Sequence, residues 1–399
     1  MKHLKFLMTI IAVSFIFFTG CKKELKSGSM VAPDELQSKD ASVAKQSTRL
    51  SAASKTKLNK LQSSLPAGNK ALERSSGLLL KMHPEFGDMV RRAMDIEPPC
   101  DANTAMNQWL DQQLADWDAD IFNYVLNTAM LDLPTYNALL FENSPANQYF
   151  GVRGEYTQRI TKTFKDLKRF WNIQSNDIVL AAMHGSMLRD RDKLVRTYVF
   201  VYGLSDEDAQ FYADFVLELL HDVPQYRNGD HPVFTFNSFA QESFNFPPVG
   251  VIPPKIIMGD GIMEAFTAIG FNDVAPQAIL AHEFGHQIQF QLGVFGNENT
   301  PEATRRTELM ADAYAAYYLS HARGASMQWK RVKQFLQVFF NIGDCAFTST
   351  GHHGTPTQRM ASAEWAYNVA NNAQKQGHIL TSQQFTALFE AQLPEILMH

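Results

Sequence analysis

The sequence His-Glu-Phe-Gly-His at positions 282–286 lies in an apolar stretch, 274–292, whose spacing predicts a helix. Residues four apart share a helix face, so His282 and His286 can offer ring nitrogens to one Zn²⁺. Glu283 lies about 100° round the helix from His282 and about 60° from His286, which places its carboxylate beside the ion. There it can act as a general base on zinc-bound water and pass the proton to a leaving amine. The motif therefore predicts a single Zn²⁺ with Glu283 as the catalytic base.

Two acidic residues downstream, Glu308 and Asp312, are candidates to complete this site. A catalytic zinc ion takes three protein ligands and leaves one position open. Thr300 reads as the N-cap of a second, antiparallel helix over 301–322, with proline at its first position. Glu308, in the second turn, is expected to be the third ligand. Asp312, one turn later on the same face, is expected to accept the free ring N–H of a ligand histidine. The alternative is a solvated face with two acids at helical spacing.

The remaining periodicity predicts an α+β fold. Helices are expected over 69–95, 107–131, from 134, over 155–170 and over 206–221, the last capped by Ser205. Strands are expected at 178–183, 195–202, 233–236 and 255–259. On the first motif helix, Leu280, Phe284 and Ile288 are expected to face inward. The expected organisation is a mostly helical region, 61–175, followed by a domain over 176–399 that carries the motif.

The N-terminus resembles that of a bacterial lipoprotein. Lys2 and Lys5 precede an uncharged apolar run that is too short to span a bilayer and fits a signal peptide over 1–20. Small residues then precede Cys21, as in a lipobox, which implies that Cys21 carries the lipid and anchors the chain to a membrane. Residues 21–60 read as a flexible tether, because they carry eight Lys, seven Ser and no aromatic residue. An ordinary secretory signal or a short anchor helix is the alternative.

Composition excludes several classes of protein. With 36 Lys and Arg against 41 Asp and Glu, the chain lacks the basic excess of a nucleic-acid binder, so no nucleic-acid partner is expected. Three cysteines in 399 residues exclude a disulfide-rich scaffold. Cys100 and Cys345 are far apart in sequence, and either a disulfide or two free thiols is compatible with that spacing.

The motifs together resemble the gluzincin branch of zinc metallopeptidases, and more particularly the putative neutral zinc metallopeptidases. Three stretches carry the resemblance. They are the HExxH motif with the run from Glu308, the sequence His-Gly-Thr-Pro-Thr-Gln-Arg over 353–359, and Asn-Ser-Phe-Ala over 237–240. The likeness covers roughly residues 230–375, and residues 61–175 match no family that can be named.

The resemblance implies a zincin-like fold in which the edge strand of a small sheet pairs with an extended peptide or protein substrate, beside the zinc helix. The oxyanion-stabilising residue is open: His353 is one candidate, and His352, Tyr314 and Tyr317 are others. The expected function is peptide-bond hydrolysis by a membrane-tethered zinc metallopeptidase in the bacterial cell envelope, in the outer membrane or on the periplasmic or outer surface face. A non-catalytic zinc-binding envelope lipoprotein, acting as a scaffold or assembly factor, is the alternative.

Overall fold

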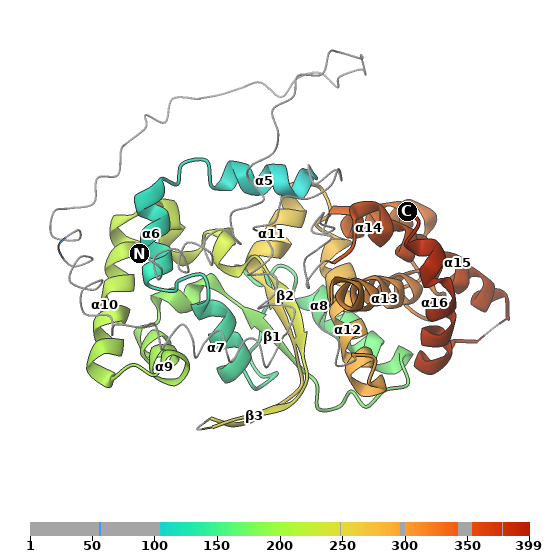
Figure 1. Ribbon diagram of the computed structural model, residues 1–399, viewed down its shortest axis with the longest axis horizontal. Helices are drawn as coiled ribbons and strands as arrows, with labels where there is room; N and C mark the ends of the chain where they lie inside the picture. Colours follow the sequence, from blue (N-terminus) through green and yellow to red (C-terminus); the bar gives the residue numbers. More distant parts are fainter. Residues whose placement is uncertain (1–55, 57–103, 248, 296–299, 342–352, 377) are drawn as a thin grey trace, which may run out of the picture.

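The computed structural model describes residues 56, 104–247, 249–295, 300–341, 353–376 and 378–399. The predicted signal peptide, Cys21, the tether apart from residue 56, and the expected helix 69–95 lie outside these residues, as do Cys100 and Cys345. Within the described part, many helices surround a small sheet, so the fold is α+β (Figure 1). None of the described helices has the length and apolar character needed to cross a bilayer.

The helices and strands follow one another in an order that mixes both types from residue 179 to 259. The helices before and within this region are α5 (Ala105–Gln113), α6 (Ala119–Asn127), α7 (Leu133–Phe141), α8 (Thr157–Phe170), α9 (Arg191–Tyr202) and α10 (Asp206–Asp222). The strands are β1 (Val179–Met183), β2 (Ser238–Gln241), β3 (Phe244–Phe246), β4 (Gly250–Ile252) and β5 (Lys255–Gly259). The helices after them are α11 (Asp260–Ala268), α12 (Ala275–Leu292), α13 (Pro301–Ser320), α14 (Trp329–Asn341), α15 (Pro356–Gln376) and α16 (Ser382–Ile396).

The main sheet has three strands in the order β1-β5-β2. β5 runs parallel to β1 and antiparallel to β2, with Gln241 opposite Lys255 at one end of the β2–β5 pair. β3 and β4 form a separate hairpin. β2 is therefore an edge strand.

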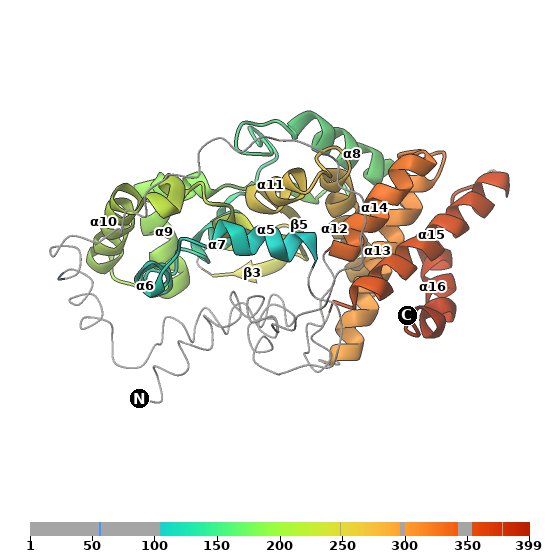
Figure 2. The same ribbon diagram turned by 90° about the horizontal axis from the view of Figure 1, so that it is seen from above.

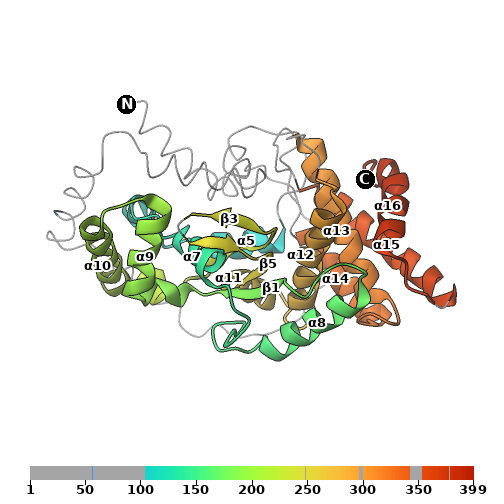
Figure 3. The same ribbon diagram turned by 90° about the horizontal axis from the view of Figure 1, so that it is seen from below.

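This sheet separates two hydrophobic cores, because successive side chains of a strand point to opposite faces. Ile256 and Met258 lie in the core formed with α8 and the helices from α11 onward. Ile257, between them, lies in the core formed with α6, α7, α9 and α10. Figure 1 shows the sheet in the middle, with α9 and α10 on one side and α12, α13, α15 and α16 on the other, and Figure 2 shows the same two groups from above. In Figure 3, α8 lies alongside α12, against which it packs.

The segment before the sheet contributes to both cores. Met106 and Ile160 pack with the helices from α11 onward, whereas Leu110 and Tyr136 pack with α9 and α10. The described part of the predicted helical region thus shares its interior with the rest of the chain.

Three predictions about secondary structure are wrong. The run 195–202 was expected to be a strand and is the C-terminal part of α9, whose ends are fixed by the Asp190 cap and by Gly203 in the left-handed conformation at φ 65°. Residues 233–236 were expected to be a strand and instead lie at a short 3₁₀ turn, Pro232–Thr235. The single helix expected over 107–131 is broken into α5 and α6, because Asp118 caps a new helix by accepting from the Ile121 N–H.

Candidate metal centre

The helix α12 carries the HExxH motif and lies within two residues of its predicted bounds. It ends where Gly293 adopts the left-handed conformation at φ 64°, which a glycine allows without strain. Leu280, Phe284 and Ile288 are fully buried in the core, as predicted. This apolar face holds α12 in place and leaves its other side for the histidines.

The helix α13 lies against α12 and begins at the predicted cap, where the Thr300 side chain accepts from the Ala303 N–H. The two helices approach closely at Gly285 and Ala311. A Cβ at position 285 would lie 3.1 Å from the Ala311 Cα, tighter than ordinary van der Waals contact. The close approach brings Glu308 to the two histidines.

His282, His286 and Glu308 converge on one point. The two Nε2 atoms lie 3.1 Å apart, and each lies 3.3 Å from a different carboxylate oxygen of Glu308. Tetrahedral ligands bound to Zn²⁺ at about 2.0–2.1 Å lie about 3.3–3.4 Å from one another. The two nitrogens and the Glu308 carboxylate are therefore close enough together to be ligands of one zinc ion.

The other nitrogen of each histidine has a fixed partner. His282 Nδ1 lies 2.8 Å from Asp312 Oδ1, and His286 Nδ1 lies 2.8 Å from Gln289 Oε1. The amide of Gln289 is oriented by its own Nε2, which donates to the Thr307 carbonyl at 2.6 Å. Since carboxylate and amide oxygens accept, each Nδ1 carries a proton, and each Nε2 is left for a metal ion or a second proton.

Two lone pairs and a carboxylate that meet in a buried site require a cation. Burial disfavours the charged form of His282, yet the hydrogen bonds to Asp312 and Glu308 outweigh it and raise the pKa of His282 to about 10. The same balance raises the pKa of His286, where Glu308 outweighs burial. Burial raises the pKa of Glu308, but His353 and His286 outweigh it and hold that pKa well below its usual value. The group is thus built to share positive charge, as protons or as a metal ion.

Asp312 is held by a second partner that the sequence did not reveal. Arg359, near the start of α15, donates from Nε to Asp312 Oδ2 and from Nη2 to Asp312 Oδ1, both at 2.7 Å. Its Nη2 also lies 3.6 Å from Glu308 Oε2. Arg359 belongs to the sequence 353–359 singled out above, where His353 was selected in its place. No local spacing marks it, because its partner lies 47 residues upstream.

The remaining predicted site residues lie around the metal-binding group. Glu283 is only 5 % exposed, and its charge raises the pKa of the neighbouring His286. His353 is half-buried and close enough to Glu308 to lower its pKa. His352 lies outside the described residues. The two tyrosine candidates have other partners, since Tyr314 hydrogen-bonds to Thr386 and the Tyr317 hydroxyl accepts from the Leu380 N–H.

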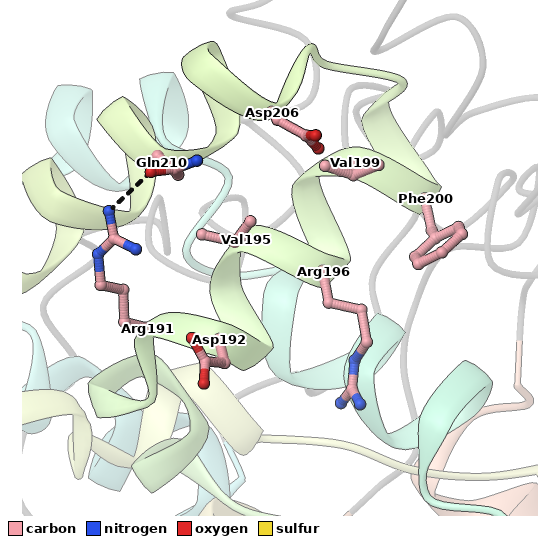
Figure 4. A pocket seen from close by; sticks show the side chains of 8 residues that line it. All are labelled: Arg191, Asp192, Val195, Arg196, Val199, Phe200, Asp206 and Gln210. Carbon is pink, nitrogen blue, oxygen red and sulfur yellow. Dashed lines mark hydrogen bonds between the residues drawn. The ribbon is translucent and has the colours of Figure 1, made fainter.

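A hollow lies between α9 and α10, on the other side of the sheet from α12 (Figures 1 and 4). It is shallow and open, and it is lined by Arg191, Asp192, Val195, Arg196, Val199, Phe200, Asp206 and Gln210. Arg191 forms two hydrogen bonds with the Asp214 carboxylate, and Arg196 stacks over Phe141. Their charges are thus committed to neighbouring side chains.

No family model, no curated protein and no solved structure matches this chain. Among the residues that the structure describes, His282, His286 and Glu308 are the one group of His, Cys, Asp and Glu side chains close enough to share a metal ion. The chemistry of the chain therefore has to be inferred from this group and its surroundings.

Proposed function

We propose that the chain is a zinc-dependent peptidase of zincin-like fold, tethered to the bacterial cell envelope by a lipid on Cys21. The observation that carries the proposal is the convergence of His282 Nε2, His286 Nε2 and the Glu308 carboxylate, with the Glu283 carboxylate beside them. Two neutral imidazoles and one carboxylate are a donor set typical of catalytic zinc sites, which keep a fourth position open.

The residues present fit Zn²⁺ in chemistry as well as in size. The Nδ1 of each histidine is engaged by an acceptor, so that Nε2 is left for the ion, and the pKa of Glu308 is held well below its usual value, so Glu308 is ionised. A divalent ion held there supplies Lewis-acid chemistry, polarising a carbonyl and activating water. The charge of Asp312 is balanced by Arg359, so it orients His282 without adding net negative charge to the site.

Glu283 is the proposed general base. Its place in the sequence, directly after His282, puts its carboxylate on the metal side of α12. It is buried beside His286, so it can hold a proton taken from water and deliver it to the leaving amine.

His353 is the proposed donor to the oxyanion that develops in peptide hydrolysis. It lies in the segment leading into α15, which also brings Arg359 to the site. The lowering of the Glu308 pKa by His353 supports this assignment. A ring N–H directed at the reacting carbonyl would stabilise the transition state more than the ground state.

The edge strand β2 is the proposed binding surface for the peptide. The Gly259 N–H donates to the Asn237 carbonyl, and hydrogen-bonded pairs alternate along an antiparallel ladder, so Ala240 directs its backbone groups away from β5. In the described part of the chain, no backbone group pairs with Ala240 on that side. Ala240 itself is 2 % exposed, whereas Ser238 and Phe239 are partly exposed, so an extended peptide would add as a further strand from the Ser238 end of β2.

The test is cleavage of a mixed peptide library by the purified chain, with zinc content measured on the same sample. We expect cleavage that a chelator abolishes and Zn²⁺ restores. Glu283→Gln should keep its zinc and lose activity by about 10²–10⁴-fold. Glu264→Gln, which changes a glutamate of α11 outside the site, is the matched control and should retain activity.

These results decide between a peptidase and a non-catalytic zinc-binding lipoprotein. Equal activity of wild type and Glu283→Gln would overturn the peptidase mechanism. Zinc binding without cleavage of any library peptide would favour a non-catalytic zinc-binding envelope lipoprotein. Metabolic labelling with a fatty acid, compared between wild type and Cys21→Ala, tests the anchor separately from the chemistry.

A further inference from the structure

Gln287 ties the metal-binding helix to two strands at once. Its side chain is 2 % exposed, and its Nε2 donates to the Gln241 carbonyl at 3.0 Å and to the Lys255 carbonyl at 2.7 Å. Those two residues lie opposite each other at one end of the β2–β5 pair. A primary amide has two N–H donors, so both donors of the Gln287 side chain bond to the sheet.

The same end of the sheet is held from its other face. The Lys255 side chain is fully buried, and its Nζ donates to the carbonyls of Ala138 and Leu139 in the last turn of α7. β5 is thus fixed to α7 on one face and to α12 on the other. Of the three elements joined at this point, β2 is the edge strand and α12 carries the metal ligands.

Gln287 is adjacent to His286 in sequence, so a shift of α12 relative to the strands moves both residues together. The ligand frame, by contrast, is built from α12, α13 and Arg359 of α15, through Gln289, Asp312 and the Gly285 contact. A change at Gln287 can therefore alter the position of the metal relative to β2 without altering the metal's ligands.

We propose that Gln287 is a positioning residue that sets the register between the metal centre and the edge strand, and so selects which bond of an extended peptide is cleaved. The inference rests on the proposed peptidase function. A peptide that adds to β2 is fixed by hydrogen bonds to that strand, so the bond over the metal depends on where α12 holds the metal along it. A displacement of about 1 Å is enough to reduce rates by about 10²-fold.

The experiment compares wild type with Gln287→Met, which keeps the length of the side chain and removes both donors. The control is Gln291→Met on the same helix. Gln291 is exposed and also forms two backbone hydrogen bonds, but to Gln174, away from the sheet. Three quantities are measured on the zinc-loaded full chain: zinc affinity, the positions of cleavage in one long peptide by mass spectrometry, and hydrogen exchange of residues 238–241.

We expect Gln287→Met to keep zinc affinity within about threefold of wild type, to lower kcat by about 10–100-fold, and to spread cleavage over neighbouring bonds. Exchange in 238–241 should become faster, and Gln291→Met should match wild type in all three. An unchanged cleavage position, or a loss of zinc affinity in proportion to the loss of rate, would overturn the proposal.

Failure of the peptidase function gives a different pattern. In that case wild type binds zinc and cleaves nothing. The exchange of 238–241 then decides whether Gln287 holds β2 against α12: equal exchange in wild type and Gln287→Met would show that it does not.

Discussion

Asp312 and Arg359 form an ion pair with two hydrogen bonds, each 2.7 Å long, in which both side chains are almost completely buried. The pair lies behind His282, whose Nδ1 shares Asp312 Oδ1 with the guanidinium. A carboxylate that accepts from a ligand histidine strengthens that ligand, and the guanidinium prevents the carboxylate from remaining an uncompensated buried charge. A helix 47 residues downstream thus completes the support of the metal centre.

Replacing Arg359 should weaken both folding and zinc binding. Arg359→Met leaves Asp312 as a buried charge with one partner fewer, which costs about 3–5 kcal/mol of unfolding free energy. Zinc affinity should fall by about 10–100-fold, as it does when outer partners of metal ligands are lost. Urea unfolding in saturating zinc and competition with a chromophoric chelator measure the two effects.

The double variant Asp312→Asn with Arg359→Met is the control for the charge argument. It removes both members of the pair, so part of the lost stability should return. The contrary result is a double variant with a lower unfolding free energy than Arg359→Met, by as much as Asp312→Asn alone removes from wild type. Burial of an unpaired charge would then not be the cause of the Arg359→Met effect.

Gln289 should determine the zinc affinity through His286. In Gln289→Met the His286 Nδ1–H loses its acceptor and the Thr307 carbonyl loses a donor, so the imidazole is no longer fixed in one tautomer. We expect a loss of about 10–100-fold in zinc affinity. Gln277→Met, on the same helix but bonded to the Asp273 carbonyl, is the control and should bind zinc as wild type does. Equal affinities for the two variants would contradict the assignment.

Zinc binding should strengthen as the pH rises. In the metal-free protein the pKa of His282 is raised to about 10 from its usual 6.5, because Asp312 and Glu308 outweigh burial. That protonation stabilises the metal-free fold below about pH 6.5, and the stabilisation is lost as the pH rises through 10. Zinc must displace this proton, so its apparent association constant should rise about tenfold per pH unit for each proton released.

The measurement compares thermal unfolding with a fixed excess of zinc and with chelator, between pH 6.5 and 9. The stabilisation by zinc should grow across this range. A stabilisation that stays constant would show that the group holds no proton in the absence of metal.

The sequence predicted those parts of the site that depend on local spacing. Helix periodicity places His282 and His286 on one face of α12. The cap at Thr300 fixes where α13 begins, and therefore in which turn Glu308 lies. The contact between Glu308 and the histidines thus follows from two antiparallel helices joined by a turn. Arg359 could not be found in this way, since its role depends on how α15 packs against α13. Gln289 and Gln287 were not predicted, because the sequence around a glutamine in a helix does not indicate which group its side chain will hydrogen-bond.

The errors in the fold have the same origin. The run 195–202 is rich in β-branched and aromatic residues and reads as a strand, yet it is half-buried on a helix whose two ends are capped. The caps, Asp190 and Gly203, were the available signal and lie outside the run. The 3₁₀ turn at 232–235 was mistaken for a strand because a short apolar run has no period that separates the two.

Lys255 should make the stability of the protein rise with pH. Burial lowers the pKa of its amine to about 7, against a smaller opposing effect of Glu142. The unfolded chain holds the proton up to about pH 10.4, so between pH 7 and that value unfolding takes up a proton and stability increases. The stabilisation is complete above the unfolded pKa and is lost as the pH falls through 7. For a shift of this extent, the stabilisation is on the order of 5 kcal/mol.

The contribution of Lys255 can be separated from all other titrating groups by subtraction. Lys255→Met keeps the apolar stem and removes the amine, and the other groups titrate alike in both proteins. The unfolding free energy of wild type minus that of Lys255→Met should therefore increase from pH 6.5 to pH 9.5, measured by urea unfolding in the presence of chelator. At the lower pH the variant loses the hydrogen bonds to the α7 carbonyls but avoids burying a charge, so the difference should be small. A difference that is the same at both pH values would show that the amine keeps its ordinary charge in the folded protein.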